Sequence, residues 1–264
     1  MNNGIQISKM SKSYGNVRAL NNVSLNILPG ELFGLIGPDG AGKTTLFRIL
    51  TTLLLADKGK ATVCGLDVVN HLKEIRCRVG YMPSRFSLYQ DLTVEENLNF
   101  FATVFRTTID ANYELIRDIY QQIEPFKHRR AEKLSGGMKQ ELALCSALIH
   151  KPDVLFLDEP TTGVDPVSRK EFWDMLKRLK SQGITILVST PYMDEASRCD
   201  RIALMREGKI LSVDTPQGVT QGFQHPLLAV TTHNMETMYP LLKELRAHPQ
   251  TLQCFSYEIH FTSH

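Results

Sequence analysis

The chain has 264 residues, a formal net charge of +2 at pH 7, 42% hydrophobic residues and 22% charged residues, which is the composition of an ordinary globular protein of one or two domains. The nearly balanced charge argues against broad electrostatic binding of nucleic acid, because neither a long basic run nor a basic amphipathic helix is present. Five cysteines without a Cys-x-x-Cys pair argue against a disulfide framework and a structural zinc site, and they indicate a reducing compartment.

The N-terminus, Met1-Asn2-Asn3-Gly4, lacks the basic and then apolar regions of a signal peptide. No apolar run approaches the ~18 residues that a membrane span needs. We therefore expect that the chain does not itself cross a membrane.

Two half-buried strands are expected first, because Ile5–Ile7 and Val23–Ile27 alternate apolar with polar residues. Tyr14-Gly15-Asn16 marks a turn between them, which places Tyr14 on a loop. From its position alone, Tyr14 is equally well explained as an aromatic side chain that covers the edge of the sheet.

The next stretch, Gly37-Pro38-Asp39-Gly40-Ala41-Gly42-Lys43-Thr44, fits the phosphate-loop pattern of Gly, four residues, Gly, Lys and Ser or Thr. Small residues let backbone N–H groups close around a polyphosphate, Lys43 supplies a charge, and Thr44 offers a hydroxyl to Mg²⁺. An apolar strand, Leu32–Ile36, precedes the loop, and helical apolar spacing follows over Thr44–Leu50. We interpret the stretch as a nucleotide phosphate site rather than a glycine-rich turn that matches by chance.

After this helix the sequence predicts strands at Ala61–Val63 and Val79–Met82, and Pro83 ends the second. From residue 93 to about 150 there is no convincing strand, and apolar residues recur at helical spacing, so we expect a helical insert. Thr93 and Glu96 form a candidate capping box at its start.

The insert ends in Leu134-Ser135-Gly136-Gly137-Met138-Lys139-Gln140, and an apolar-periodic helix follows. Ser-Gly-Gly at a helix start offers exposed N–H groups and the positive end of the dipole, which favour a phosphate. A plain helix cap explains the same residues equally well when they are read in isolation.

Val154–Leu157 is a continuous apolar run followed by Asp158 and Glu159, as in a strand that is buried on both faces of a parallel sheet. Ligands bind at the carboxyl ends of such strands. One acid there can hold Mg²⁺, and the other can orient or deprotonate an attacking water. Two solvated acids at a strand end are the alternative.

A helix begins at Pro166 and ends at Gly183, and its apolar face, which includes Trp173, is expected to pack in the core. Ile184–Ser189 is another buried strand. The alternation of strands and helices predicts a parallel α/β sheet with helices on both faces.

From about Pro226 the sequence predicts a strand (Leu227–Val230), a helix (Met235–Arg246) and a second strand (Leu252–Phe261). We interpret residues 1–222 as the main domain and residues 223–264 as a short, incomplete βαβ-like extension of α+β type.

Over residues 5 to about 220 the chain resembles the ATP-binding subunit of an ABC transporter. The resemblance rests on the phosphate loop, on Leu134–Gln140 as the ABC signature, on Leu155–Glu159 as the Walker B strand and on Gly163-Val164-Asp165 as the D-loop, all in the order of the family. It implies an α/β fold with a P-loop NTPase sheet, an N-terminal antiparallel β subdomain and a helical insert.

The resemblance also implies ATP and Mg²⁺ as cofactors and a role for each matching residue. Tyr14 would stack on adenine, Lys43 would hold phosphate and Glu159 would be the general base. Two such subunits sandwich two ATP molecules, so the signature would face the γ-phosphate held by the other chain's phosphate loop. The implied nucleotide contacts are Tyr14, Gly37, Pro38, Asp39, Gly40, Ala41, Gly42, Lys43, Thr44, Thr45, Ser135, Gly136 and Gly137, with Thr44 and Asp158 at Mg²⁺.

Two positions depart from the family pattern. Ser84 stands where the family usually has a Gln that touches Mg²⁺ and water, and Pro191 stands where it has a switch His on the γ-phosphate. No histidine lies between His150 and His225 to substitute for it. Loss of one preorganised donor typically costs about 10²- to 10³-fold in rate, so we expect a slow site on this chain's Walker side. Asp39 in place of the usual Asn is a milder change.

The phosphate loop, the missing switch His and the tail together resemble the first cassette of the tandem double-cassette ATPases of bacterial drug-type exporters. This implies an ATPase subunit on the inner face of the membrane, bound to permease subunits and to a second ABC cassette in a homodimer, heterodimer or tandem arrangement. A non-catalytic regulatory cassette is one alternative, which Ser84 and Pro191 favour and the intact Lys43 and Glu159 disfavour. A soluble ABC protein that acts on ribosomes or DNA is another, but the long coiled-coil or basic insertions usual in that group are not visible.

Overall fold

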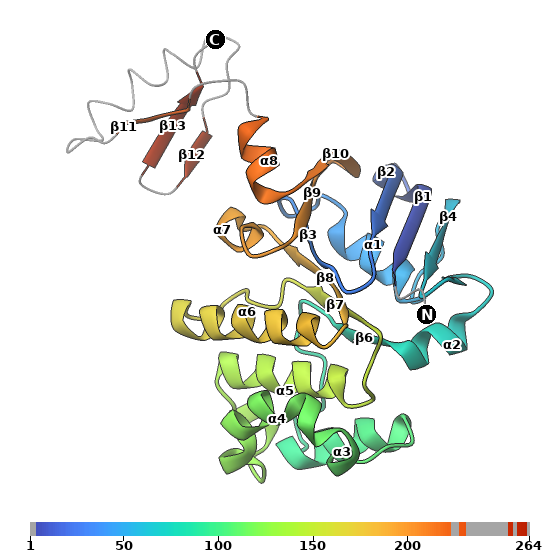
Figure 1. Ribbon diagram of the computed structural model, residues 1–264, viewed down its shortest axis with the longest axis vertical. Coiled ribbons are helices and arrows are strands. Elements are labelled where there is room, and N and C mark those ends of the chain that lie inside the picture. The colour runs from blue at the N-terminus through green and yellow to red at the C-terminus, as the bar shows by residue number, and fades with distance from the viewer. Residues whose placement is uncertain (1–3, 223–226, 231–252, 256–257, 263–264) are drawn as a thin grey trace. The chain divides into compact units, whose positions relative to one another are not determined.

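The computed structural model describes residues 4–222, 227–230, 253–255 and 258–262 (Figure 1). The chain divides into two compact units, Met1–Gln217 and Gly218–His264.

The first unit begins with a four-stranded antiparallel sheet of order β2-β1-β4-β5. Its strands are β1 (Ile5–Tyr14), β2 (Val17–Ile27), β4 (Lys58–Val63) and β5 (Leu66–Asp67). The strands expected at residues 5–7, 23–27 and 61–63 are confirmed, and each is longer than the sequence indicated. The placement of Tyr14 on a loop is wrong, because Gly15, at φ +56°, turns the chain so tightly that Tyr14 still pairs with Val17.

The second sheet has six strands in the order β10-β9-β3-β8-β7-β6. They are β3 (Leu32–Ile36), β6 (Val79–Met82), β7 (Val154–Asp158), β8 (Thr185–Thr190), β9 (Arg201–Arg206) and β10 (Lys209–Asp214). All neighbours pair in parallel except β9 and β10. Every residue of β3, β7 and β8 is buried, as expected for strands covered on both faces. The α/β fold class is therefore confirmed, with one antiparallel edge strand that the sequence analysis did not predict.

Helices cover this sheet. The first, α1 (Lys43–Leu50), contacts β7 as well as β2 and β4, so it lies between the two sheets (Figure 1). The long helix α6 (Pro166–Ser181) packs on β3 and β8, and Trp173 on its inner face is fully buried. Two shorter helices, α2 (Leu72–Arg78) and α7 (Met193–Ala196), precede β6 and follow β8. Within the described part of the chain, no helix is both long enough and apolar enough to span a membrane.

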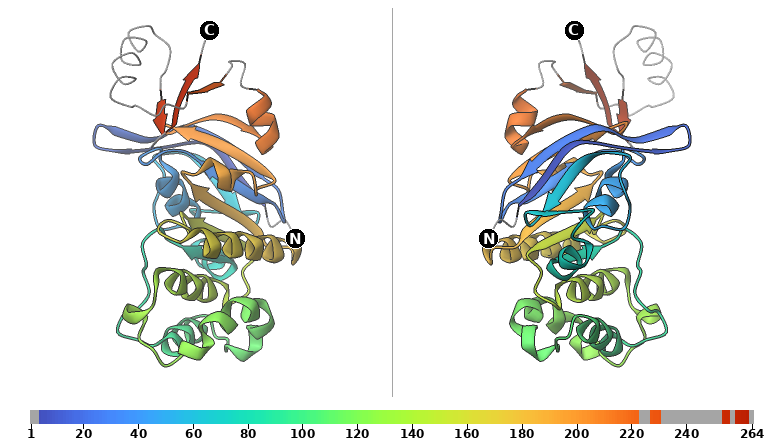
Figure 2. Two further views of the ribbon diagram at one scale, coloured as in Figure 1. Left: turned by 90° about the vertical axis from the view of Figure 1, so that its left-hand side faces the viewer. Right: turned by 90° about the vertical axis from the view of Figure 1, so that its right-hand side faces the viewer.

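The predicted helical insert is confirmed and lies away from the antiparallel sheet (Figures 1 and 2). It contains α3 (Val94–Val104), α4 (Tyr113–Ile123) and α5 (Gly136–Leu148). One 3₁₀ turn lies between α3 and α4, and two lie between α4 and α5. The Thr93/Glu96 capping box is also confirmed, since each side chain accepts the other residue's backbone N–H.

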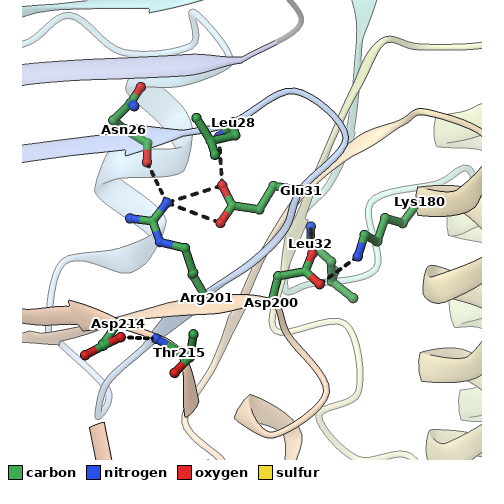
Figure 3. A network of polar contacts seen from close by, with 9 residues as sticks. All are labelled: Asn26, Leu28, Glu31, Leu32, Lys180, Asp200, Arg201, Asp214 and Thr215. Atoms are coloured by element: carbon green, nitrogen blue, oxygen red, sulfur yellow. Dashed lines mark hydrogen bonds and ion pairs between the residues drawn. The ribbon is translucent and has the colours of Figure 1, made fainter. Parts of the chain in front are cut away.

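Polar contacts fix the start of β3, the strand that leads into the phosphate loop (Figure 3). Asp200 accepts the backbone N–H of Leu32 at 2.9 Å and a bond from Lys180 Nζ of α6 at 2.6 Å. One residue along, Arg201 Nη1 lies 3.3 Å from Glu31 Oε1, and Glu31 is almost wholly buried. These pairs join β3, β9 and α6 at one end of the sheet and so hold the loop-bearing strand in register.

In the second unit the described strands are β11 (Leu227–Val230), β12 (Gln253–Phe255) and β13 (Glu258–Thr262). They form an antiparallel sheet of order β11-β13-β12. The strand at 227–230 is confirmed, but the single strand expected over 252–261 is wrong, because it is two paired strands. No Gly, Pro or Asn interrupts that stretch, so the sequence held no turn signal. The helix predicted over 235–246 lies outside the described residues, and α8 (Pro216–Gln221) crosses the boundary of the two units.

Candidate nucleotide-binding site

The phosphate loop joins β3 to the N-terminus of α1 and is pressed against neighbouring backbone. A Cβ on Gly37 would lie 2.2 Å from Met205 O, and one on Gly42 would lie 2.3 Å from Ala19 O. Gly42 is also the N-cap of α1, with φ +107°, and within the described residues no side chain caps this helix. Only glycine fits these two positions, and the helix end is left to serve an anion.

Lys43 is the first residue of α1 and is nearly buried, with 4% of its side chain exposed. Its Nζ donates to Gly37 O at 2.7 Å and to Pro38 O at 3.0 Å, and it lies 3.1 Å from Glu159 Oε1. The lysine therefore shapes the loop and joins it to the end of β7, although the two partners are 116 residues apart in sequence.

The acids that end β7 are held by β8. Asp158 is fully buried, and its Oδ1 accepts a bond from Ser189 Oγ at 2.6 Å. Its Oδ2 is also buried and has no hydrogen-bond partner among the described residues. A buried carboxylate oxygen without a partner is costly. Together with the Thr44 hydroxyl it offers the hard oxygen ligands that suit Mg²⁺, so the residues present fit that ion.

Glu159 follows in an unusual backbone conformation. Its φ is +52°, which costs a non-glycine residue about 1–2 kcal/mol. The conformation is held because Glu159 N–H faces both Ser189 O, at 3.1 Å, and Ser189 Oγ, at 3.0 Å. Backbone strain of this kind is typical of functional sites. Here it turns the carboxylate toward Lys43.

A pocket of about 490 Å³ brings these residues together. Residues from the β1–β2 hairpin, the phosphate loop, the segment after β6 and the end of β7 line it. Of the predicted site residues, those that line it are Tyr14, Asp39, Gly40, Ala41, Gly42, Lys43, Thr44, Thr45 and Glu159. Ser84 lines it as well, so the position of the missing Gln does face this pocket. Val17, Arg18 and Ala19 also line the pocket and were not predicted, although their place just after the Tyr14-Gly15-Asn16 turn was an available signal.

The other departure from the family pattern lies beside the same loop. Gly37 N–H donates to Thr190 O at 3.4 Å, so Pro191 follows the last β8 residue next to the phosphate loop. Pro191 carries no side-chain donor. The two positions that distinguish this chain thus border one site.

The signature residues lie elsewhere. Ser135 is the N-cap of α5 and accepts Met138 N–H at 3.3 Å, so the plain-cap interpretation is correct as far as it goes. Gly136 and Gly137 lie near the D-loop and the start of α6. A Cβ on Gly136 would lie 3.8 Å from Gly163 O, and a Cβ on Gly137 would lie 3.8 Å from Ser168 Oγ. Within one chain these residues do not reach the phosphate-loop pocket.

One acid near the signature has an altered pKa. Burial, reinforced by the negative charge of Glu171 on α6, raises the pKa of Glu141 on α5 to about 7. The facing pair lines a cavity between α5 and α6. Close to neutral pH, the uncharged form of Glu141 therefore relieves its repulsion by Glu171.

The site combines a glycine loop at a helix N-terminus, a buried lysine on that helix and a carboxylate pair at the end of β7, in the same sheet as β3. Together with the two sheets and the helical insert, these features define an ATP-binding cassette. The family model of the ABC transporter matches residues 20–162. The chain belongs to this family.

Curated relatives agree over most of the chain. It is 41% identical over 214 residues to the "Probable multidrug ABC transporter ATP-binding protein YbhF" of Escherichia coli (strain K12), which covers 80% of this chain and 37% of that protein. It is 38% identical over 218 residues to the Nod factor export ATP-binding protein I of Paraburkholderia xenovorans (strain LB400), covering 81% of this chain and 72% of that protein. The chain thus spans little more than a third of the length of YbhF.

Solved structures agree on the fold. The dimeric structure of MJ0796, a bacterial ABC transporter cassette, superposes with a TM-score of 0.73 at 26% identity and covers 80% of this chain and 98% of that chain.

Proposed function

We propose that this chain is the ATP-binding and ATP-hydrolysing subunit of an ABC exporter. The observation that carries the proposal is the meeting of Lys43 and Glu159, 3.1 Å apart, in a pocket lined by the phosphate loop and Tyr14. ATP, when bound, supplies the phosphoanhydride bond whose hydrolysis drives transport. The backbone N–H groups of the loop would hold its phosphates, Thr44 and Asp158 would hold Mg²⁺, and Glu159 would orient the attacking water.

The first test is nucleotide affinity. Lys43→Ala should weaken binding of a fluorescent ATP analogue at least about tenfold, because a charge-assisted contact to phosphate contributes about 1.5–3 kcal/mol. Lys60→Ala, which removes an exposed lysine from β4, is the matched control and should bind as the unsubstituted chain does. Equal affinity of the Lys43→Ala and Lys60→Ala variants in a fluorescence titration would contradict the proposal.

The names of the relatives support export. One refers to multidrug transport and the other to Nod factor export, and the MJ0796 cassette is dimeric. On this proposal the chain works at the inner face of the cell membrane with permease subunits and a second cassette. The resemblance to a first tandem cassette belongs to the same proposal.

An apolar groove supports docking of a permease. It measures about 370 Å³ and lies between the sheet core and the helical insert, where Leu53, Met82 and Phe101 are among its lining residues. His150 at its edge stacks on Phe105, with ring centroids 3.8 Å apart, and burial lowers the pKa of His150, which keeps the ring neutral near pH 7. Such a surface suits an apolar cytoplasmic segment of a membrane subunit rather than a nucleic acid.

A photo-crosslinking amino acid at Leu53, which is 58% exposed at this groove, should therefore capture a membrane subunit in intact cells. The matched control is Leu211 on β10, which is 62% exposed and does not line the groove. Capture is measured by mass spectrometry of the cross-linked products. If position 53 captured only ribosomal proteins or nucleic acid, the soluble alternative would replace the transporter proposal.

The regulatory alternative has one specific observation in its favour, because Ser84 and Pro191 border the nucleotide site without offering the usual donors. Against it stand Asp158, Glu159 and Lys43, which keep the arrangement that hydrolysis needs. We therefore propose a degenerate site that hydrolyses slowly, rather than one that only binds.

A further inference from the structure

Glu195 is a buried acid that the proposed mechanism does not use. It lies on α7, directly after β8, and only 1% of it is exposed. One carboxylate oxygen accepts a hydrogen bond from Thr190 Oγ1 at 2.5 Å, and the other accepts one from Thr161 Oγ1 at 2.6 Å. Hydrogen bonds to a buried ionised carboxylate are among the stronger ones in proteins.

The two threonines belong to two different borders of the nucleotide site. Thr190 is the last residue of β8, its backbone oxygen accepts Gly37 N–H of the phosphate loop, and Pro191 follows it. Thr161 stands two residues after Glu159, and its backbone oxygen accepts Val164 N–H in the D-loop. A single carboxylate therefore bridges Thr190–Tyr192, which we call the switch segment, and the residues that lead into the D-loop.

Contacts continue from Glu195 to the signature. Arg169 Nε of α6 lies 3.5 Å from Glu195 Oε1, an ion-pair distance, and the guanidinium covers the Tyr192 ring at 4.9 Å. One residue before Arg169, Ser168 faces Gly137, and Gly163 O faces Gly136. A shift of the segment after β8 would thus be transmitted through Glu195 to the start of α5.

We propose that Glu195 is a positioning residue that holds the D-loop and the signature start in register with the switch segment. This rests on the proposed function, in which the signature faces the ATP of a second cassette. Because Pro191 has no side-chain donor to contact a γ-phosphate, this chain couples its own site to the partner's site through the Thr190–Glu195–Thr161 bridge.

The bridge can be opened from either end. Thr161→Val removes the D-loop link and Thr190→Val removes the switch link, both with little change of volume. If the bridge acts as one unit, either variant should lower kcat of the assembled complex about tenfold. The double variant should have the same kcat as the single variants, because each single substitution already breaks the connection between the two segments. The ATP KM and the nucleotide affinity of the isolated chain should change less than about twofold, since neither threonine lines the nucleotide pocket.

The conservative variants Thr161→Ser and Thr190→Ser keep the hydroxyls and should restore kcat. The Thr190 control is needed because Thr190 Oγ1 also accepts Tyr192 N–H at 3.1 Å. A merely structural role predicts otherwise: the losses in kcat would add in the double variant and would follow the melting temperature and the nucleotide affinity.

Two results would overturn the inference and leave the proposed function standing. One is a loss of kcat in the double variant that equals the sum of the single losses, and the other is an unchanged kcat for both valine variants in an active complex. If the unsubstituted chain bound no nucleotide or formed no active complex, the proposed function and the further inference would both be wrong. The unsubstituted protein therefore distinguishes the two failures.

Discussion

Gly42→Ala is expected to abolish measurable nucleotide binding. The added Cβ would lie 2.3 Å from Ala19 O and 2.9 Å from Met205 Cε, at a residue with φ +107°. The left-handed backbone alone costs about 1–2 kcal/mol. The overlap with the carbonyl of β2 cannot be relieved by a rotamer change, so the loop and the first turn of α1 must move. We expect a loss of at least about 100-fold in affinity for ADP, which corresponds to about 2.7 kcal/mol.

Gly65→Ala is the matched control. Gly65 has φ +76°, but a Cβ there meets nothing within 4 Å, and it lies outside the nucleotide pocket. It should lower the free energy of unfolding in urea by about 1–2 kcal/mol and leave binding unchanged. Titration calorimetry with ADP separates the two variants. Nucleotide binding by Gly42→Ala that equalled binding by Gly65→Ala would mean that the close approach to Ala19 does not shape the site.

How much of the site could be predicted depended on how local its parts are. The phosphate loop is contiguous, and its flanking strand and helix are encoded by the same few residues, so its position was predicted to within one residue. The neighbouring acids Asp158 and Glu159 followed from the rule that parallel strands end at one edge of a sheet. The 3.1 Å contact between Lys43 and Glu159 is the consequence of those two local patterns.

Features that depend on how one strand pairs with another were missed. The hairpin of β9 and β10 turns at Gly208, with φ +74°, but its strands mix charged and apolar residues and gave no clear alternation. Tyr14 was placed on a loop because Gly15 and Asn16 signal a turn without fixing how far the strands pair. The length and the partner of each strand depend on the pairing register, which the sequence of a single strand does not encode.

Glu195 shows the same limit at a single residue. Within Tyr192-Met193-Asp194-Glu195-Ala196 it resembles any exposed acid in a short helix. It is buried where two threonines converge on it: Thr161 lies three residues after the end of β7, and Thr190 ends the neighbouring parallel strand β8. Neither threonine belonged to a pattern that points to the other.

Ser135→Arg is expected to abolish most ATPase activity of the assembled complex, whereas Glu159→Gln should remove only a minor share. The reason is the proposed division of each ATP site between two cassettes. This chain's Walker side lacks the Gln at Ser84 and the His at Pro191, and each missing donor costs about 10²- to 10³-fold. Its signature, with Ser135 at the exposed start of α5, is complete and would serve the partner's ATP.

Each substitution acts on one site. Glu159→Gln removes the proposed general base and the ion pair with Lys43 on this chain's own side. Ser135→Arg places a long cation where the partner's γ-phosphate would lie, but it also removes the N-cap bond to Met138, which is worth about 1 kcal/mol. Ser135→Ala removes the same cap without adding bulk, and it should therefore retain much more activity than Ser135→Arg.

The measurement is steady-state ATP hydrolysis by the purified complex with each of the three variants, beside the isolated chain. The complex is required because the isolated chain can pair only with itself, and both of its sites would then lack the two donors. We expect the order of activity to be Glu159→Gln above Ser135→Ala above Ser135→Arg, with the isolated chain slow throughout. If Glu159→Gln were the most damaging change, or if the isolated chain hydrolysed ATP as fast as the complex, then Ser84 and Pro191 would be harmless, because a site that lacks both donors could not otherwise account for most of the turnover.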